Sequence, residues 1–83
     1  VFPNPFVNTI QVDLGPEITG RYSINVLDAS GKVLVSKTSS KSNVSFTESV
    51  DATRLTYGIY FVEVISNNGR SVTKVKKILP SQY

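Results

Sequence analysis

The sequence predicts an all-β domain, an immunoglobulin-like antiparallel β-sandwich of about six to seven short strands. Three observations support this fold class. Apolar and polar residues alternate with a period of two in several segments, which is typical of strands with one buried face. Turn-forming residues separate these segments at intervals of roughly 8–12 positions. No helical periodicity lasts beyond about two turns, and the 83 residues suffice for one domain around one core.

We divide residues 1–83 into an extended lead-in (residues 1–8), a sandwich (residues 9–79) and a short tail (residues 80–83). Prolines on both sides of Asn4 disfavour a helix in the lead-in. Two strictly alternating segments follow the lead-in. Each is expected to turn three apolar side chains inward: Ile10, Val12 and Leu14 in residues 9–14, and Tyr22, Ile24 and Val26 in residues 21–27.

A hairpin is predicted around residues 28–31. Asp28 in the first position and Gly31 in the fourth are typical of a type I turn with a left-handed glycine. Residues 32–38 are therefore expected to return beside the preceding strand. The next two segments are predicted to be a polar loop and a weaker strand, at residues 39–43 and at residues 44–50 with Val44 and Phe46.

The strongest strand pattern lies at residues 58–66 and is apolar on both faces. One face carries Tyr60, Val62 and Val64, and the other carries Ile59, Phe61 and Ile65. We therefore expect a central strand whose second face is also covered. Tyr60 follows a corner and is placed to return its hydroxyl to the backbone, with Leu55 as the apolar plug before it. Gly58 is expected to hold a backbone conformation that a β-carbon disfavours.

The last strand is predicted at residues 70–79, after a hairpin turn at residues 67–69. Its apolar residues break strict alternation, so a β-bulge is expected near Lys74. The same residues are spaced i, i+3, i+6, which also permits a short helix; they are Val72, Val75 and Ile78.

Positive charge is concentrated in this last strand. Residues 1–69 carry a net charge of −1, whereas residues 70–83 carry +4. Two interpretations stay open: a charged edge that prevents sheet-to-sheet aggregation, and a docking strip for an acidic partner or an anionic surface.

Composition argues against catalysis. The sequence contains no His, Cys, Met or Trp, which removes the common nucleophile–base pairs and most ligands of zinc, copper and iron–sulfur sites. We predict no enzyme activity, no cofactor and no metal site. Asp28, Ser30 and Asp51 offer oxygens for calcium, but an EF-hand ligand run is missing, and Asp28 is expected to start a turn. We also predict no membrane span and no nucleic-acid binding.

Four motifs, in this order and spacing, carry a family resemblance: FPNP at residues 2–5, DASGK at residues 28–32, LTYGIYFV at residues 55–62 and KVKKI at residues 74–78. Together they resemble the type A C-terminal sorting domain of the type IX (Por) secretion system. The resemblance implies an immunoglobulin-like sandwich at the end of a larger secreted protein. It also implies export of an attached cargo through an outer-membrane translocon to the cell surface or medium, and removal of the domain by a sortase-like peptidase.

The resemblance assigns recognition by the translocon to a small set of residues. These are Pro3, Asn4, Pro5, Gly58, Tyr60, Lys74, Lys76 and Lys77. The chain departs from the family pattern at Phe2, where Tyr is common, and in the tail after Ile78, which runs past the usual basic and hydrophobic end. The mechanism expected from the residues is pairing of a receptor strand with the last strand, together with electrostatic attraction to its lysines.

Two other function classes stay open from the sequence. One is a carbohydrate- or protein-binding accessory sandwich of a secreted enzyme, and the other is an inert immunoglobulin-like spacer. Aromatic residues available for sugar binding are Phe2, Phe6, Tyr57, Phe61 and Tyr83. Apolar residues on both faces of residues 58–66 also permit weak self-association through sheet edges.

Overall fold

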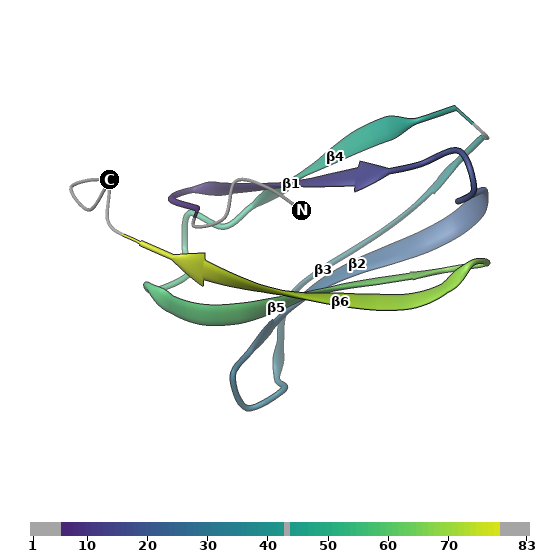
Figure 1. Cartoon of the computed structure of the whole chain (residues 1–83). Coiled ribbons are helices and arrows are strands. Elements are labelled where there is room, and N and C mark those ends of the chain that lie inside the picture. The colour runs from purple at the N-terminus through teal and green to yellow at the C-terminus, as the bar shows by residue number, and fades with distance from the viewer. Residues whose placement is uncertain (1–5, 43, 79–83) are drawn as a thin grey trace.

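Six β-strands in two antiparallel sheets make up the computed structural model, which describes residues 6–42 and 44–78. In chain order they are β1 (Thr9–Leu14), β2 (Gly20–Asp28), β3 (Val33–Lys41), β4 (Phe46–Asp51), β5 (Gly58–Ser66) and β6 (Gly69–Lys77). Strands β1 and β4 form one sheet, and the other has the order β3-β2-β5-β6. Figure 1 shows the smaller sheet as a second layer above the larger one. The described residues contain no helix, so the predicted all-β sandwich is confirmed.

The core lies between the two sheets and comes from alternate positions of their strands. The inward residues predicted for β1, β2 and β5 are all buried, which confirms the alternation: Ile10, Val12, Leu14, Tyr22, Ile24, Val26, Tyr60, Val62 and Val64. Phe6, Val50, Ala52 and Val75 complete the cluster. Because apolar burial contributes roughly 25 cal/mol per Å², this shared face is the main source of stability.

The two predicted hairpin turns are present. Gly31 N donates to Asp28 O at 3.0 Å, and Gly31 has a φ of 90°, the left-handed conformation expected of it. The Asp28 carboxylate accepts hydrogen bonds from the Ser30 hydroxyl and from the backbone N–H groups of Ser30 and Lys32. The Ser30 hydroxyl makes the largest contribution to lowering the pKa of Asp28. Asp28 therefore starts the turn, as predicted, and Asn67 and Asn68 connect β5 to β6.

The two sheets differ in width, and lysines bridge the open sides. The two-stranded sheet is too narrow to cover the four-stranded one. Inward-facing residues of the edge strands β3 and β6 therefore face loops and the edges of the smaller sheet. Lysines occupy three of these inward positions: Lys37 and Lys41 on β3, and Lys77 on β6. Long aliphatic stems let their ammonium groups reach the opposite layer. We call these three residues the lysine clasp.

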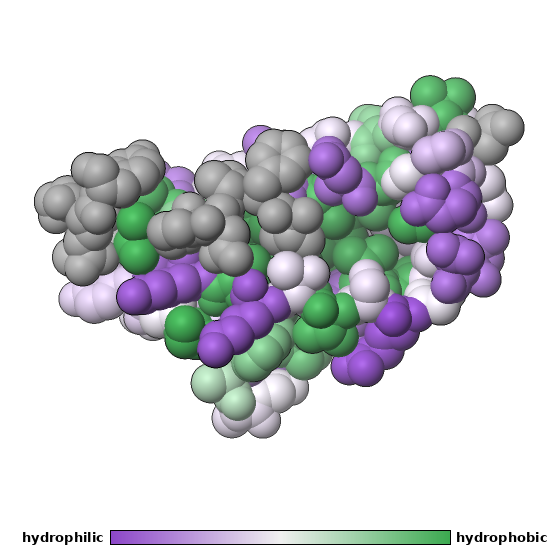
Figure 2. Space-filling model, viewed as in Figure 1, coloured by the Kyte–Doolittle hydropathy of each residue, from purple (hydrophilic) through white to green (hydrophobic). Residues whose placement is uncertain are grey.

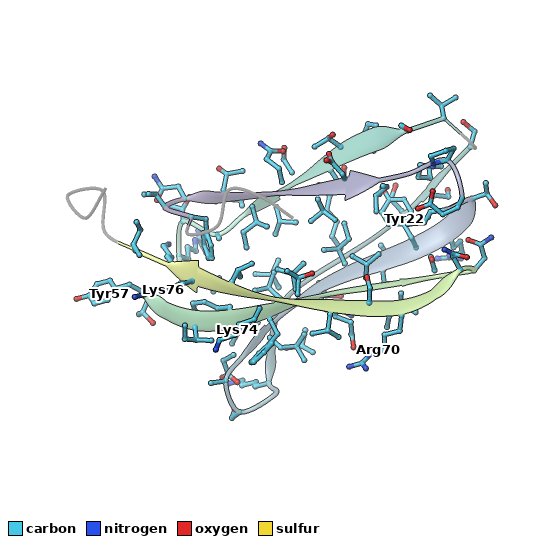
Figure 3. The ribbon with its side chains drawn as sticks, in the orientation of Figure 1. Tyr22, Tyr57, Arg70, Lys74 and Lys76 are labelled. Atoms are coloured by element: carbon cyan, nitrogen blue, oxygen red, sulfur yellow. The ribbon has the colours of Figure 1, made fainter. Side chains whose placement is uncertain are left out.

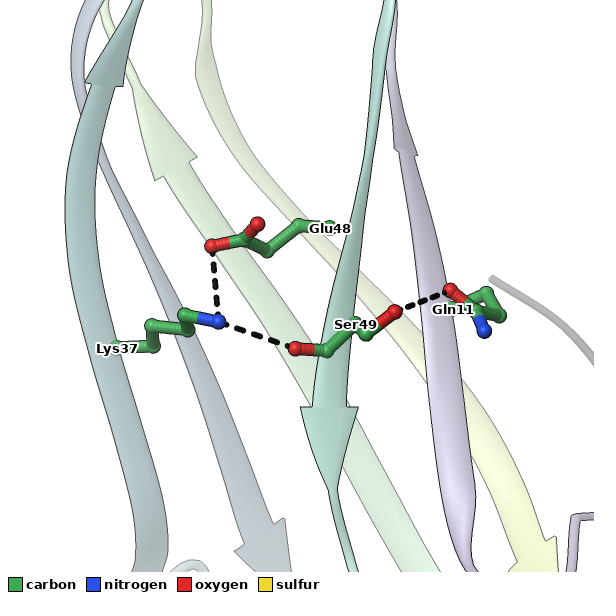
Figure 4. A network of polar contacts seen from close by, with 4 residues as sticks. All are labelled: Gln11, Lys37, Glu48 and Ser49. Atoms are coloured by element: carbon green, nitrogen blue, oxygen red, sulfur yellow. Dashed lines mark hydrogen bonds and ion pairs between the residues drawn. The ribbon is translucent and has the colours of Figure 1, made fainter.

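Lys37 connects β3 to the smaller sheet. Its Nζ lies 3.1 Å from Glu48 Oε1 and donates to Ser49 O at 3.1 Å. The Ser49 hydroxyl in turn donates to Gln11 Oε1 at 2.8 Å, so polar contacts run from β3 through β4 to β1 (Figure 4). Glu48 is a buried carboxylate in the layer between the sheets, and Lys37 supplies the opposite charge that such a group requires.

The other two clasp lysines bind backbone carbonyls. Lys41 Nζ donates to the carbonyl oxygens of Gly15, Ile18 and Ser42, which engages the three N–H donors of an ammonium group. The buried Lys77 Nζ donates to the carbonyl oxygens of Ala52 and Thr53. Lys41 therefore fixes the β1–β2 connection to β3, and Lys77 fixes the β4–β5 connection to β6.

Two segment boundaries differ from the prediction. The polar loop predicted at residues 39–43 is wrong for residues 39–41, because β3 stays paired with β2 as far as Lys41. The weaker strand begins at Phe46, and its buried side chains are Glu48 and Val50, whereas Val44 and Phe46 are exposed. Backbone pairing at a sheet edge tolerates a run of serines, which the side-chain pattern alone does not indicate.

The last strand contains no bulge at Lys74. Its pairing with β5 is continuous from Gly58↔Lys77 to Ser66↔Gly69. The apolar residues instead lie on different sides: Val72 is exposed on the outer face, and Val75 is buried on the inner face. The predicted helix alternative is likewise wrong, since these residues form β6.

Strand β5 is central, as predicted, but its second face is not covered by the described residues. It lies between β2 and β6. The outward side chains of Ile59 and Ile65 keep 37% and 42% of their surface exposed. A sheet in a two-layer sandwich has only one face in the core. Apolar residues on both faces of β5 therefore reflect its central place in the sheet, and they do not mean that a further layer covers the outer face.

Substitution of Lys37 tests the clasp. We expect Lys37→Met to lower the free energy of unfolding by about 1–3 kcal/mol, because it leaves the Glu48 carboxylate without its cation. Replacing both partners, Lys37→Met with Glu48→Met, should recover most of the loss. Urea denaturation measures both, with Lys32→Met in the exposed turn as the matched control. A Lys37→Met protein as stable as the control would contradict the clasp.

Candidate functional site

The basic residues of β6 divide between the two faces of the sheet. Arg70, Lys74 and Lys76 are exposed, and Figure 3 shows all three on the side of β6 that faces away from the β1–β4 sheet. Lys77 points to the other face of the strand and is buried in the clasp. The structure therefore brings together two of the three predicted lysines and adds Arg70. We call Arg70, Lys74 and Lys76 the basic strip.

Strand β6 is an edge strand whose C-terminal end is closed by the lead-in. Phe6 N donates to Lys76 O at 2.9 Å, and Ile78 N donates to Phe6 O at 2.9 Å. Phe6 is fully buried and pairs in parallel with Lys77. The predicted strand addition by a receptor at this end of β6 thus meets backbone groups that the chain itself already pairs.

A buried carboxylate orients one member of the basic strip. Glu63 lies on the outer side of β5, accepts a hydrogen bond from Asn25 Nδ2 at 2.9 Å and contacts Arg70 Nε at 2.5 Å. The hydrogen bond from Asn25, followed by that from Arg70, lowers the pKa of Glu63. Glu63 therefore stays ionised and fixes the Arg70 guanidinium along the outer face.

An apolar hollow lies beside the basic strip. It has a volume of about 300 Å³ and is lined by the β2–β3 turn with Leu27, Phe61, Arg70 and Val72. Exposed Val33, Ile59 and Ile65 lie on the same sheet. Figure 2 shows hydrophobic and hydrophilic surface side by side along this part of the molecule. We call Leu27, Val33, Ile59, Phe61, Ile65 and Val72 the outer apolar patch.

Gly58 and Tyr60 form the corner that leads into β5. The buried Tyr60 ring lies 6.4 Å from that of Phe6, and its hydroxyl donates to Thr56 O at 2.5 Å. Leu55 packs against the core below this corner, as predicted. Gly58 has a φ of 148°, and a β-carbon there would meet no atom within 4 Å, so the requirement for glycine is conformational. Both residues have the structural roles predicted for them.

Several predicted residues lie outside the described part of the chain. These are Pro3, Asn4 and Pro5, together with Phe2 and Tyr83. Among the aromatic residues considered for sugar binding, Phe6 is in the core, Phe61 is half-buried, and Tyr57 is exposed. A flat platform of several rings is therefore not formed by the aromatic residues that the structure describes.

The carboxylates make structural contacts. Asp51 accepts hydrogen bonds from the hydroxyl and backbone N–H of Thr53, and these lower the pKa of Asp51. Residues 6–42 and 44–78 contain no group of three carboxylates that could hold a metal ion. Within the same residues, no helix is long and apolar enough to cross a membrane.

The Tyr60 hydroxyl gives a first test of this site. Tyr60→Phe should lower the free energy of unfolding by about 0.5–1.5 kcal/mol, because the Thr56 carbonyl loses its donor while the ring remains. Tyr57→Phe, at a residue that is 65% exposed, is the matched control and should change stability by less than about 0.5 kcal/mol. Equal losses in urea denaturation of the two variants would rule out the corner bond.

The lowered pKa of Glu63 predicts a pH-dependent contribution to stability. Because the folded-state pKa lies below the ordinary value of 4.5, the carboxylate stabilises the fold above that value. This stabilisation is lost as the pH falls through the lowered pKa. Wild-type protein should be more stable than Glu63→Gln at about pH 7, and the difference should shrink below about pH 4.5. Urea denaturation across this range measures it, with exposed Glu17→Gln as control; a difference independent of pH would refute the assignment.

Comparison with known proteins places the chain in a family. The chain matches the secretion system C-terminal sorting domain over residues 1–79. No curated protein and no solved structure matches it. The match spans the described sandwich, the Tyr60 corner and the basic strip. The chain therefore belongs to the family of C-terminal sorting domains of the type IX (Por) secretion system.

Proposed function

We propose that this domain directs an N-terminally attached cargo protein through the type IX outer-membrane translocon to the cell surface or medium, and that a sortase-like peptidase then removes it. The family match over residues 1–79 carries the proposal. Members of this family are targeting signals and not catalysts.

The basic strip is the element that we assign to translocon recognition. Arg70, Lys74 and Lys76 are exposed on one face of a strand whose neighbours are fixed by the core. Cations held along one line raise the rate of encounter with an acidic receptor and orient the complex. Of the other recognition residues, Pro3, Asn4 and Pro5 are assigned to the lead-in next to the cargo.

Gly58, Tyr60 and Lys77 serve recognition indirectly in this proposal. Tyr60 packs on Phe6, and Phe6 pairs with the end of β6. Lys77 holds the same end of β6 to the β4–β5 connection. These contacts hold the C-terminal end of β6 against the rest of the domain, so their loss would act through the fold.

An accessory sugar-binding role is not favoured. A small β-sandwich that binds sugars uses exposed aromatic residues together with converging polar groups. The described residues expose two aromatic rings, Tyr57 in the β4–β5 connection and Phe46 at the start of β4. They come from different elements, and no polar groups are seen to converge on either ring. The family match also assigns the domain to sorting.

Reversing the charge of the strip tests the proposal. In a reporter fused ahead of residues 1–83, Lys74→Glu with Lys76→Glu should lower export by about tenfold or more, because the attraction to an acidic receptor is lost. Lys77 is left intact, since its substitution would disturb the clasp. Arg21→Glu with Arg54→Glu makes the same change in net charge at exposed positions off the strip and away from the β2–β3 turn, and should export normally.

Secreted reporter is quantified in a strain with and without a functional type IX translocon. Thermal unfolding of each purified variant confirms that it is folded. Export of the unchanged fusion that does not depend on the translocon would refute the sorting function. Equal export by the strip variant and its control would refute the role of the strip.

A further inference from the structure

We propose that the outer face of the four-stranded sheet, centred on Val72, docks a protein surface that carries apolar side chains bordered by carboxylates. This inference rests on the proposed sorting function and names the kind of partner that the domain meets during export. The occupant is a component of the export machinery. The argument rests on the pairing register, the exposed area and the charge of this face.

The register places apolar and basic side chains in two adjacent columns. Antiparallel partners lie directly opposite each other, with side chains on the same face. On the outer face these pairs are Ile59 with Lys76, Phe61 with Lys74, Glu63 with Val72, and Ile65 with Arg70. On this face β5 presents an apolar residue wherever β6 presents a cation. The acidic residue of β5, Glu63, lies opposite Val72, the one apolar residue on the outer face of β6.

Leu27 and Val33 extend one of these rows across the sheet. Leu27 is paired with Phe61 on one side. On the other side it is paired with Val33, where the register of β2 and β3 shifts after Val26 and leaves Leu34 without a partner in the pairing. The row therefore runs from β3 to β6 as three apolar residues followed by Lys74. The hollow of about 300 Å³ lies at this row, between Phe61, Val72 and the β2–β3 turn. A cavity of this kind accepts one apolar anchor residue, the usual centre of a protein interface.

On the remaining part of the outer face, polar side chains already form hydrogen bonds with one another. Ser23 and Thr38 contact each other at 3.2 Å, and the Ser36 hydroxyl donates to Asn25 at 2.7 Å. This polar region resembles the solvated face of an ordinary antiparallel sheet. The outer apolar patch differs from it, since Val33, Val72 and Ile65 expose 49%, 46% and 42% of their surface. The contrast within one sheet confines the docking face to the β5–β6 side and the β2–β3 turn.

Charge on this face favours an acidic protein over a second copy of the domain. The face carries four cations, Arg70, Lys74 and Lys76 on β6 and Lys32 in the β2–β3 turn, against the carboxylates Glu63 and Asp28, a net charge of +2. Glu63 is engaged by Asn25 and Arg70. Two copies facing each other would place like charges together, whereas carboxylates on a partner would complement the strip.

Substitutions at Val72 test the docking face. Val72 and Val44 are both exposed valines, at 46% and 67%, but Val44 lies outside the outer apolar patch. We expect Val72→Glu to reduce translocon-dependent export of the reporter fusion by about tenfold. The new carboxylate lies opposite Glu63 and between Arg70 and Lys74 along β6, so thermal unfolding must show that the variant is folded. On the folded face it repels carboxylates of the partner. Val44→Glu should leave export unchanged.

The sign of the charge separates an acidic partner from a merely apolar one. Val72→Lys introduces a side chain of similar size and should reduce export several-fold less than Val72→Glu. Thermal unfolding of the purified variants accompanies each assay. If Val72→Glu is not folded, Val72→Thr and Val44→Thr, which keep the β-branched shape, form the second pair. Loss of export confined to Val72→Thr is then expected, and equal export of this pair would overturn the docking face.

Several further results would overturn the inference while the unchanged fusion is still exported by the translocon. These are normal export of folded Val72→Glu, an equal loss with Val44→Glu, an equal loss with Val72→Lys, and a dimer in sedimentation that Val72→Glu abolishes. Binding of wild-type protein, but not of Val72→Glu, to phosphatidylglycerol vesicles would assign the face to a membrane and would also overturn it. Failure of the unchanged fusion to be exported would instead refute the sorting function.

Discussion

The unequal width of the two sheets is the constraint on which this structure depends. A core between two strands and four leaves both edges of the wider sheet partly uncovered. The lysine clasp (Lys37, Lys41 and Lys77) spans these sides with aliphatic stems. Lys37 contacts a carboxylate and a carbonyl of β4, and Lys41 and Lys77 bind backbone carbonyls of the connections between strands. Since a domain of this size buries only about 60% of its unfolded surface, polar contacts at the edges matter more than they would in a larger protein.

This constraint divides the basic residues into two groups with different roles. The clasp lysines face inward and hold connections, whereas the basic strip of Arg70, Lys74 and Lys76 faces outward. The division within β6 follows from alternation alone, because neighbouring residues of a strand point to opposite faces. One strand can therefore close the sandwich with Lys77 and present charge with Lys76, and a substitution at each tests a different property of the domain.

The candidate site was only partly predictable from the sequence. The charge imbalance toward residues 70–83 and the motif around Tyr60 point to β6 and to the corner before β5, the elements from which the candidate site is built. No pattern in the sequence separates Lys77 from its neighbours, because a bulge at Lys74, as expected there, would shift which residues of the strand face inward. Arg70 was not assigned, and its role depends on Glu63 and Asn25, which come from two other strands. Such contacts between distant segments leave no periodic signal.

By itself the sequence determined the strands β1, β2 and β5, the turn at Asp28, and the need for glycine at residue 58, because alternation and backbone preference act over a few neighbouring residues. Only the tertiary structure decided that β3 continues to Lys41, that the outer face of β5 is open, and that the lead-in closes the end of β6 through Phe6. Each of these outcomes depends on which strands lie side by side. That choice is made by contacts between residues far apart in the chain, where the free energy of the whole core outweighs local pattern.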